Sequence, residues 1–299
     1  DGTQTGTSSN ELGEFEIKVD TLPAKLVFHH VSYQKQFVII TDSKKEIVVQ
    51  LSPLVNILDE VVIENSKNKT DLHAINLAKK AFKKLHFLSL SKKKFGKAFY
   101  RQKTKSDNTY TEFSEIIFDI RYDLNGINNW GILEGRYALK EASINNKNFT
   151  RLSQILKSFQ PDTDDLIFPL HKKLEEFYDV RIVDVFKDKN DRITVLSFKP
   201  YKYIKTPIFI GEAYINSTTD ELLKISGTIV KDDFEFIKFT DKNAHKENYE
   251  LSFDITFKKT TNEEVVIDYI KVDQTFDYFK DEKILTKITT TSNLTFFEY

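Results

Sequence analysis

Residues 249–257, Tyr-Glu-Leu-Ser-Phe-Asp-Ile-Thr-Phe, alternate without interruption between apolar and polar side chains. Successive side chains of a β-strand point to opposite faces of the sheet, so this stretch presents one apolar face and one polar face. Antiparallel sheets commonly bury one face in a core and leave the other in water. The stretch therefore predicts a long antiparallel strand with a single buried face.

Similar alternation extends over most of the chain after residue 94. The chain contains 25 Phe and 13 Tyr, and these residues favour strands because flat rings pack well on a half-buried pleated surface. We predict a mainly β fold with a large curved antiparallel sheet whose apolar face is partly covered by helices. The further strands are predicted at 95–104, 109–122, 179–186, 192–199, 208–216, 222–230, 264–278 and 284–297.

Helices are predicted where apolar residues recur every three or four positions. Residues 71–88 show this spacing, and Thr70 or Asp71 can accept hydrogen bonds from the first free N–H groups of a helix. Residues 152–159 and 166–177 have a mixed pattern and are further candidates for covering the sheet.

The first 63 residues have the pattern of a small, separate β-domain. Short alternating stretches joined by turn-forming residues predict an antiparallel sandwich over 1–63. Residues 64–70 are polar and aperiodic, which is typical of a linker, and 71–299 would form the large sheet domain with its helix at 71–88. The predicted strands of the small domain are 14–19, 25–29, 36–40 and 46–51.

The same region resembles the carboxypeptidase regulatory-like domain, a transthyretin-like β-sandwich of Bacteroidetes envelope proteins. The chain departs from the family at Ser32, where a glycine is usual, and it lacks the family's first strands. The resemblance implies a location in the periplasm or at the outer membrane surface. It rests on 12–15 (Leu-Gly-Glu-Phe), 26–28 (Leu-Val-Phe), 31–33 (Val-Ser-Tyr), 49–53 (Val-Gln-Leu-Ser-Pro) and 58–63 (Leu-Asp-Glu-Val-Val-Ile).

The large domain carries a fainter resemblance. Residues 98–102 (Ala-Phe-Tyr-Arg-Gln) and 113–117 are similar to the region after this domain in uncharacterised Bacteroidetes envelope proteins. Residues 210–216 followed by 221–225 resemble a hairpin found in curved sheets of the lipoprotein-carrier type. These similarities imply a fold and a cell-envelope location, with no established activity.

Charge is unevenly distributed along the chain. The formal net charge is −1, yet residues 65–105 hold thirteen Lys or Arg and the single acid Asp71. Such a segment can bind an anionic partner. We favour the alternative that it forms a solvated surface, neutralised in three dimensions by acidic strands, because charge runs usually lie at the surface.

The usual signals of catalysis are missing from the sequence. There is no Cys, and no pair of the six His has the spacing of a zinc site with a third ligand nearby. The glycine-rich nucleotide motifs and the serine nucleophile motif are also missing. We predict a protein that is not an enzyme, with no cofactor and no metal; an acid pair drawn from 162–165 and 175–176 remains the alternative.

Three residues are candidates for contacts with a ligand or partner. Trp130 follows residues 125–129, which have the composition of a hairpin loop, and a Trp there can stack on a sugar or fill a partner's pocket. Tyr100 and Arg101 lie in the basic region. The alternative for each aromatic residue is a place in the core.

Together these features predict a non-catalytic envelope protein that binds or scaffolds another envelope protein, a glycan or a lipid, and that does not bind nucleic acid. No apolar run approaches 18 residues, so membrane association would need a removed anchor or a partner. One alternative function is a lipid or lipopeptide carrier that holds an acyl chain in the curved sheet. A second alternative is an acid-pair hydrolase.

Overall fold

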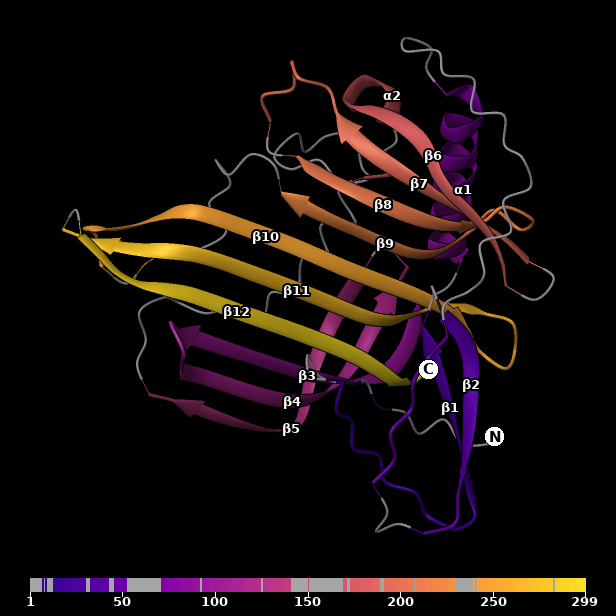
Figure 1. The fold of residues 1–299 in the computed structure, drawn as a ribbon, viewed down its shortest axis with the longest axis horizontal. Helices are drawn as coiled ribbons and strands as arrows, with labels where there is room; N and C mark the ends of the chain where they lie inside the picture. Colours follow the sequence, from indigo (N-terminus) through magenta and orange to yellow (C-terminus); the bar gives the residue numbers. More distant parts are fainter. Residues whose placement is uncertain are drawn as a thin grey trace.

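The fold is a long antiparallel sheet accompanied by a helix and a small hairpin (Figure 1). The computed structural model describes residues 7, 9, 13–30, 33–42, 46–52, 71–91, 93–124, 126–140, 150, 169–170, 173–188, 191–206, 208–229, 239, 241–281 and 283–299. Ten strands pair in the order β5-β4-β3-β12-β11-β10-β9-β8-β7-β6. They are β3 (Lys94–Ser106), β4 (Thr109–Asp123), β5 (Gly126–Leu139), β6 (Tyr178–Asp188), β7 (Asp191–Pro200), β8 (Phe209–Asn216), β9 (Glu221–Ile229), β10 (Ala244–Lys259), β11 (Val265–Lys280) and β12 (Lys283–Glu298). The predicted mainly β class and large antiparallel sheet are confirmed.

The alternation at 249–257 behaves as predicted. In β10, Phe253 pairs with Val272 of β11 and with Gly227 of β9, and all three lie on one face. On the other face, Asp254 pairs with Lys271 and Ser226. Alternating burial therefore continues across neighbouring strands, because partners in an antiparallel ladder share a face.

We call the face that carries Phe253, Val272 and Gly227 the inner face of the sheet. The opposite face is the outer face. The inner face forms one continuous core cluster, to which all ten strands of the large sheet contribute buried side chains. The outer face carries a small apolar cluster of Phe186, Ile193 and Val195 on β6 and β7. Elsewhere it has ion pairs such as Lys224–Asp254 at 2.9 Å and Lys258–Asp268 at 2.6 Å. The buried phenylalanines of the inner face are Phe118, Phe198, Phe209, Phe253, Phe257, Phe276 and Phe296.

Helix α1 (Leu72–Ser91) covers part of the inner face, as predicted for residues 71–88. Asp71 caps the helix: its Oδ1 accepts a hydrogen bond from the Ala74 N–H at 3.0 Å. The helix contacts β6 and β9 and stands beside that half of the sheet in Figure 1. Its buried stripe is rich in alanine, which lets the helix approach the sheet closely, and consists of Ala74, Ile75, Leu77, Ala78, Ala81 and Leu85.

The N-terminal region contains a two-stranded antiparallel sheet of β1 (Ala24–His30) and β2 (Tyr33–Ile40). These strands confirm the predictions at 25–29 and 36–40. Residues 14–19 and 46–51 alternate in burial as predicted but are not assigned to strands. Residues 64–70 lie outside the described residues, so the sandwich over 1–63 and the division at the linker stay predictions.

Strand β5 differs from the sequence prediction, which placed a hairpin loop at 125–129. The turn is tighter, because Asp123 already pairs with Gly126 and the strand begins there. Three glycines interrupt the alternation of β5, and its later half is exposed at the free edge of the sheet. Such a strand has little periodic signal. Of the further predicted helices, 152–159 lies outside the described residues, and 166–177 contains α2 (Leu174–Phe177).

Basic residues of the 65–105 segment pair with acids from distant parts of the chain. Lys79 contacts Glu175 at 2.5 Å, and Lys84 contacts Glu221 at 3.5 Å. Lys94, Lys97 and Arg101 pair with Glu264, Glu298 and Glu115, respectively. This pattern supports the favoured interpretation, a charged surface neutralised in three dimensions.

Candidate binding site

The inner face is not apolar throughout, although it holds seven buried phenylalanines. A strip of buried polar residues crosses β11, β12, β3 and β4, and we call it the polar strip. It consists of Gln102, Thr104, Thr111, Glu112, Ser114, Gln274, Thr290 and Ser292, which are all buried. Part of the polar strip is visible in the sequence, because Thr290 and Ser292 occupy positions of an alternating strand where apolar residues are expected.

The polar strip is held together by side-chain hydrogen bonds across the strands. Gln102 Oε1 accepts hydrogen bonds from the Tyr100 and Ser292 hydroxyls, each at 2.6 Å, and the Thr104 and Thr290 hydroxyls lie 3.0 Å apart. Gln274 Nε2 is buried and has no partner among the described residues. An unsatisfied buried amide costs free energy, so this nitrogen marks a place where a further polar group would be stabilising.

Strand β5 forms an exposed apolar rim beside the polar strip. Ile132 pairs with the buried Phe118, and Tyr137 and Leu139 pair with Ser114 and Glu112. Because ladder partners share a face, all three side chains belong to the inner face. They are nevertheless 70%, 61% and 48% exposed. The inner face therefore continues as exposed apolar surface, on the opposite half of the strand order from β6 and β9, where α1 is placed.

The structure divides the three predicted contact residues between the two faces. Tyr100 is 3% exposed on the inner face, and Trp130 is half-buried on β5, not at the edge of a loop. Both rings contact Phe118, with centroid distances of 5.9 Å and 4.8 Å. Arg101 points to the outer face, where its guanidinium contacts Glu115 at 2.6 Å. Their role as ligand contacts stays a prediction.

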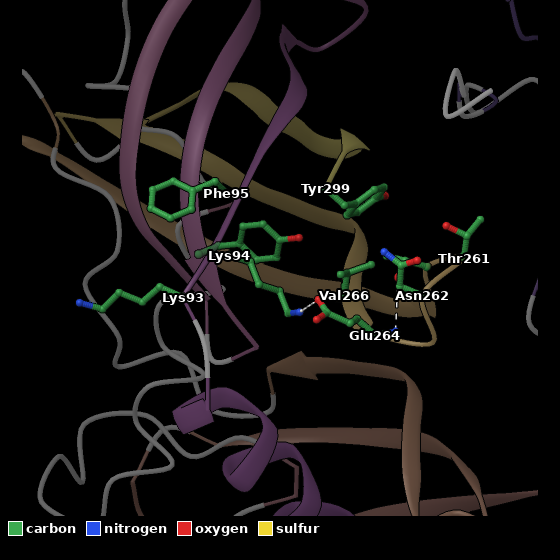
Figure 2. A pocket seen from close by; sticks show the side chains of 10 residues that line it. Lys93, Lys94, Phe95, Thr261, Asn262, Glu264, Val266 and Tyr299 are labelled. Atoms are coloured by element: carbon green, nitrogen blue, oxygen red, sulfur yellow. Dashed lines mark hydrogen bonds and ion pairs between the residues drawn. The ribbon is translucent and has the colours of Figure 1, made fainter. Parts of the chain in front are cut away.

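A pocket of about 190 Å³, which we call the end pocket, lies at the end of the sheet where β3 begins and β12 ends (Figure 2). Lys94 of β3 contacts Glu264, which follows the β10–β11 turn, at 2.8 Å. In Figure 2, Asn262 and Tyr299 lie to the right of this ion pair, whereas the side chains of Lys93 and Phe95 point to the left, away from it. The other lining residues are Tyr122, Thr260, Thr261 and Val266. None of these residues was predicted as a contact residue from the sequence, because four separate segments meet there.

Two acids of β4 show opposite electrostatic behaviour. Glu112 is buried in the polar strip, and burial raises the pKa of its carboxyl, although a hydrogen bond with Tyr137 opposes the rise. Glu115 lies on the outer face between Arg101 and Arg136. Burial would also raise the pKa of Glu115, but the two guanidinium groups outweigh it and hold that pKa below its usual range.

We expect Glu115→Gln to lower the free energy of unfolding by about 1–2 kcal/mol at pH 7, because it breaks a partly buried ion-pair network. Glu112→Gln, the matched variant, should raise it by up to about 1 kcal/mol, because a carboxylate is no longer desolvated. Both differences in unfolding free energy should shrink at acidic pH. The carboxyl of Glu112, whose pKa is raised, becomes protonated first, so its substitution then removes no charge. The stabilisation by Glu115 is lost at lower pH, as the pH falls through its lowered pKa. Urea denaturation at several pH values measures both. Equal effects of the two variants would contradict the assignment.

Two features are missing from the part of the chain that the structure describes. There, no group of three or more His, Asp or Glu side chains is arranged to hold a metal ion. In the same residues, no helix has the length and apolar character required to cross a bilayer.

Comparisons with known proteins give distant structural matches. No protein-family model matches the chain, and no curated protein matches it. The solved structures that match include the following three, all at low identity. A LolA superfamily protein from Nitrosomonas europaea has 7% identity and a TM-score of 0.27 and covers 76% of this chain and 92% of its own. A DUF1329 family protein from Desulfovibrio piger has 8% identity and a TM-score of 0.28, with 74% and 91% covered. MucB in complex with MucA has 9% identity and a TM-score of 0.20, with 75% and 93% covered. Scores this low do not establish a shared fold.

Proposed function

We propose that the protein is a non-catalytic binding protein that holds an apolar chain, such as the acyl chain of a lipid or lipopeptide, against the inner face of its sheet. The observation that carries this proposal is the exposed apolar rim of β5. Ile132, Tyr137 and Leu139 continue the buried inner face into solvent. Contiguous exposed apolar surface rimmed by polar groups is typical of a ligand or partner site.

The chemistry beside the rim suits the amphiphilic character of such a ligand. The apolar side chains of the rim can cover an acyl chain, and the polar strip lies next to them on the same face of the sheet. Ligand sites commonly combine an apolar lining with a few polar groups that fix orientation. This arrangement favours the carrier alternative over an unspecified scaffold.

Nothing among the described residues favours an acid-pair hydrolase. Glu175 is paired with Lys79, and Glu112 and Glu115 lie on opposite faces of β4. Two carboxyls that flank a scissile bond must face each other across a cleft. The acids at 162–165 lie outside the described residues. A cell-envelope location, implied by the resemblance of the first 63 residues, belongs to the proposal as well.

Binding of a fluorescent fatty-acid probe tests the proposal. The full chain should bind the probe saturably, and Ile132→Glu should weaken binding at least about tenfold, since a charge on the rim opposes contact with an acyl chain. Ile39→Glu is the matched control, because Ile39 is a 62% exposed isoleucine on β2, outside the large sheet.

Three results bear on the interpretation. Lipid extracted from the purified protein and identified by mass spectrometry would support it. Equal loss of binding in the Ile132 and Ile39 variants would contradict the assignment to the β5 rim. No saturable binding of any acyl probe would overturn the proposed function.

A further inference from the structure

The free edge of β5 presents backbone groups that no described strand uses. β5 ends the ten-strand order, so among the described strands it has a neighbour, β4, on one side only. The Lys140 N–H donates to Thr111 O at 2.8 Å, so the backbone groups of Lys140 point toward β4. These groups alternate in direction along an antiparallel strand, so those of Gly135, Tyr137 and Leu139 point away from β4. They form a row of donors and acceptors for another strand.

The opposite edge of the sheet, β6, has protection that this part of β5 lacks. Natural proteins protect edge strands with bulges, charges or a covering element. β6 has a register shift between Ile182 and Asp184, and helix α1 contacts it. Residues 134–139 of β5, in contrast, pair with β4 without a shift, contain no proline and carry the exposed apolar side chains of Tyr137 and Leu139. This stretch is therefore open to pairing.

Charges at the two ends of this stretch identify a second copy of the chain as the partner that fits. Glu134 and Lys140 are both exposed, and neither forms an ion pair with the described residues. When two identical strands pair antiparallel about a two-fold axis at Tyr137, Glu134 of each copy faces Lys140 of the other. Opposite charges at facing positions stabilise an antiparallel pair. A single two-fold axis thus satisfies both charges in each copy.

Other symmetric registers fit the charges less well. An axis one residue to either side of Tyr137 would place the Arg136 guanidinium opposite an Arg or Lys side chain of the second copy. Like charges at facing positions are destabilising. An axis at Gly135 would place Glu134 opposite Arg136, but that guanidinium already contacts Glu115 in its own chain. The charges therefore favour an axis at Tyr137.

We propose that the protein forms a two-fold symmetric dimer in which the β5 strands of two copies pair antiparallel, centred on Tyr137. About six backbone hydrogen bonds join the copies, because the facing pairs 137–137, 135–139 and 139–135 each exchange two. Two Glu134–Lys140 ion pairs lie on the outer face, and Tyr137 and Leu139 stay on the inner face. The apolar rims of the two copies therefore meet across the axis. The dimer goes beyond the proposed acyl-chain function and does not depend on it.

Sedimentation equilibrium of the full chain tests the dimer. The parent protein should self-associate with a Kd at or below about 100 µM. Glu134→Lys and Lys140→Glu should each raise this Kd at least about tenfold, because each replaces two attractive pairs with two repulsive pairs. The double variant restores both attractive pairs, so its Kd should return to within about threefold of the parent value. Glu16→Lys is the matched control and should leave the Kd unchanged, because Glu16 is exposed outside the large sheet.

Single cysteines test the register. The chain contains no Cys, so any disulfide in a one-cysteine variant must join two copies. In Tyr137→Cys the two Cα atoms would lie about 5.5 Å apart, within the range that a disulfide spans. In Ala138→Cys, the matched control, they would lie about 8 Å apart, which is too far for a disulfide. Mild oxidation followed by a non-reducing gel should therefore show a covalent dimer for Tyr137→Cys and much less for Ala138→Cys.

Three outcomes would overturn the inference. They are a chain that stays monomeric at about 500 µM, a dimer whose Kd neither charge reversal changes, and equal disulfide formation in the two cysteine variants. A Kd that Glu134→Lys raises and Lys140→Glu leaves unchanged would show that the register is wrong. These measurements use no acyl ligand, so the dimer and the proposed acyl-chain function can fail separately.

Discussion

Phe253→Ala is expected to lower the free energy of unfolding by about 3–5 kcal/mol. Phe253 is 3% exposed in the middle of β10, and its ring meets Phe209 edge to face at a centroid distance of 5.1 Å. Gly227 lies against the same ring, so a cavity left by truncation has no neighbouring side chain at that position to fill it. Urea denaturation of the variant and the parent protein measures the loss.

Two control variants show whether the loss comes from the core. Phe253→Leu should cost less, about 1–1.5 kcal/mol, because most of the buried volume is kept. Phe37→Ala, at a 62% exposed position on β2, should change stability by about 0.5 kcal/mol or less. A loss of about 1 kcal/mol or less for Phe253→Ala would show that the inner face is not packed at this point.

Gly96→Ala is expected to cost about 2–3 kcal/mol, the second-largest effect predicted, because it overpacks a backbone contact. A Cβ atom at Gly96 would lie 2.2 Å from the carbonyl oxygen of Glu298 on the neighbouring strand β12. That oxygen belongs to the main chain, so relief would require β3 and β12 to separate. Thermal and urea unfolding measure the cost.

The close approach at Gly96 also connects this prediction with the end pocket, which is lined by the preceding residues Lys94 and Phe95. Separation of β3 and β12 should therefore weaken binding of any ligand in that pocket. Gly131→Ala is the matched control, because its Cβ would meet its nearest atom at 3.3 Å. If the two alanine variants had equal stability, the tight contact between β3 and β12 would be contradicted.

Most strands and the main helix could be predicted because their signals are local. The alternation at 249–257 and the helical spacing at 71–88 record which side chains are buried, whatever the partner of each element. Strand β5 was missed for the opposite reason. Most of its later half is exposed on both faces, so burial left no periodic pattern on it.

The candidate site was far less predictable than the fold. Tyr100 and Trp130 were singled out as isolated residues, and the structure shows that both contact Phe118 while Arg101 faces the other way. The polar strip could have been noticed in β12, where Thr290 and Ser292 replace apolar residues. Ser292, however, forms its hydrogen bond with Gln102, which lies 190 positions away in the chain.

By itself, the sequence determined the mainly β class, the one-sided burial of the strands and the position of α1, because side-chain alternation and helical spacing depend only on neighbours along the chain. Only the tertiary structure decided where β5 lies, which part of the inner face is polar and how the end pocket is assembled. The pocket combines Lys94, Tyr122, the turn at 260–264 and Tyr299. These segments meet because β12 pairs with β3, a long-range ladder that no local pattern specifies.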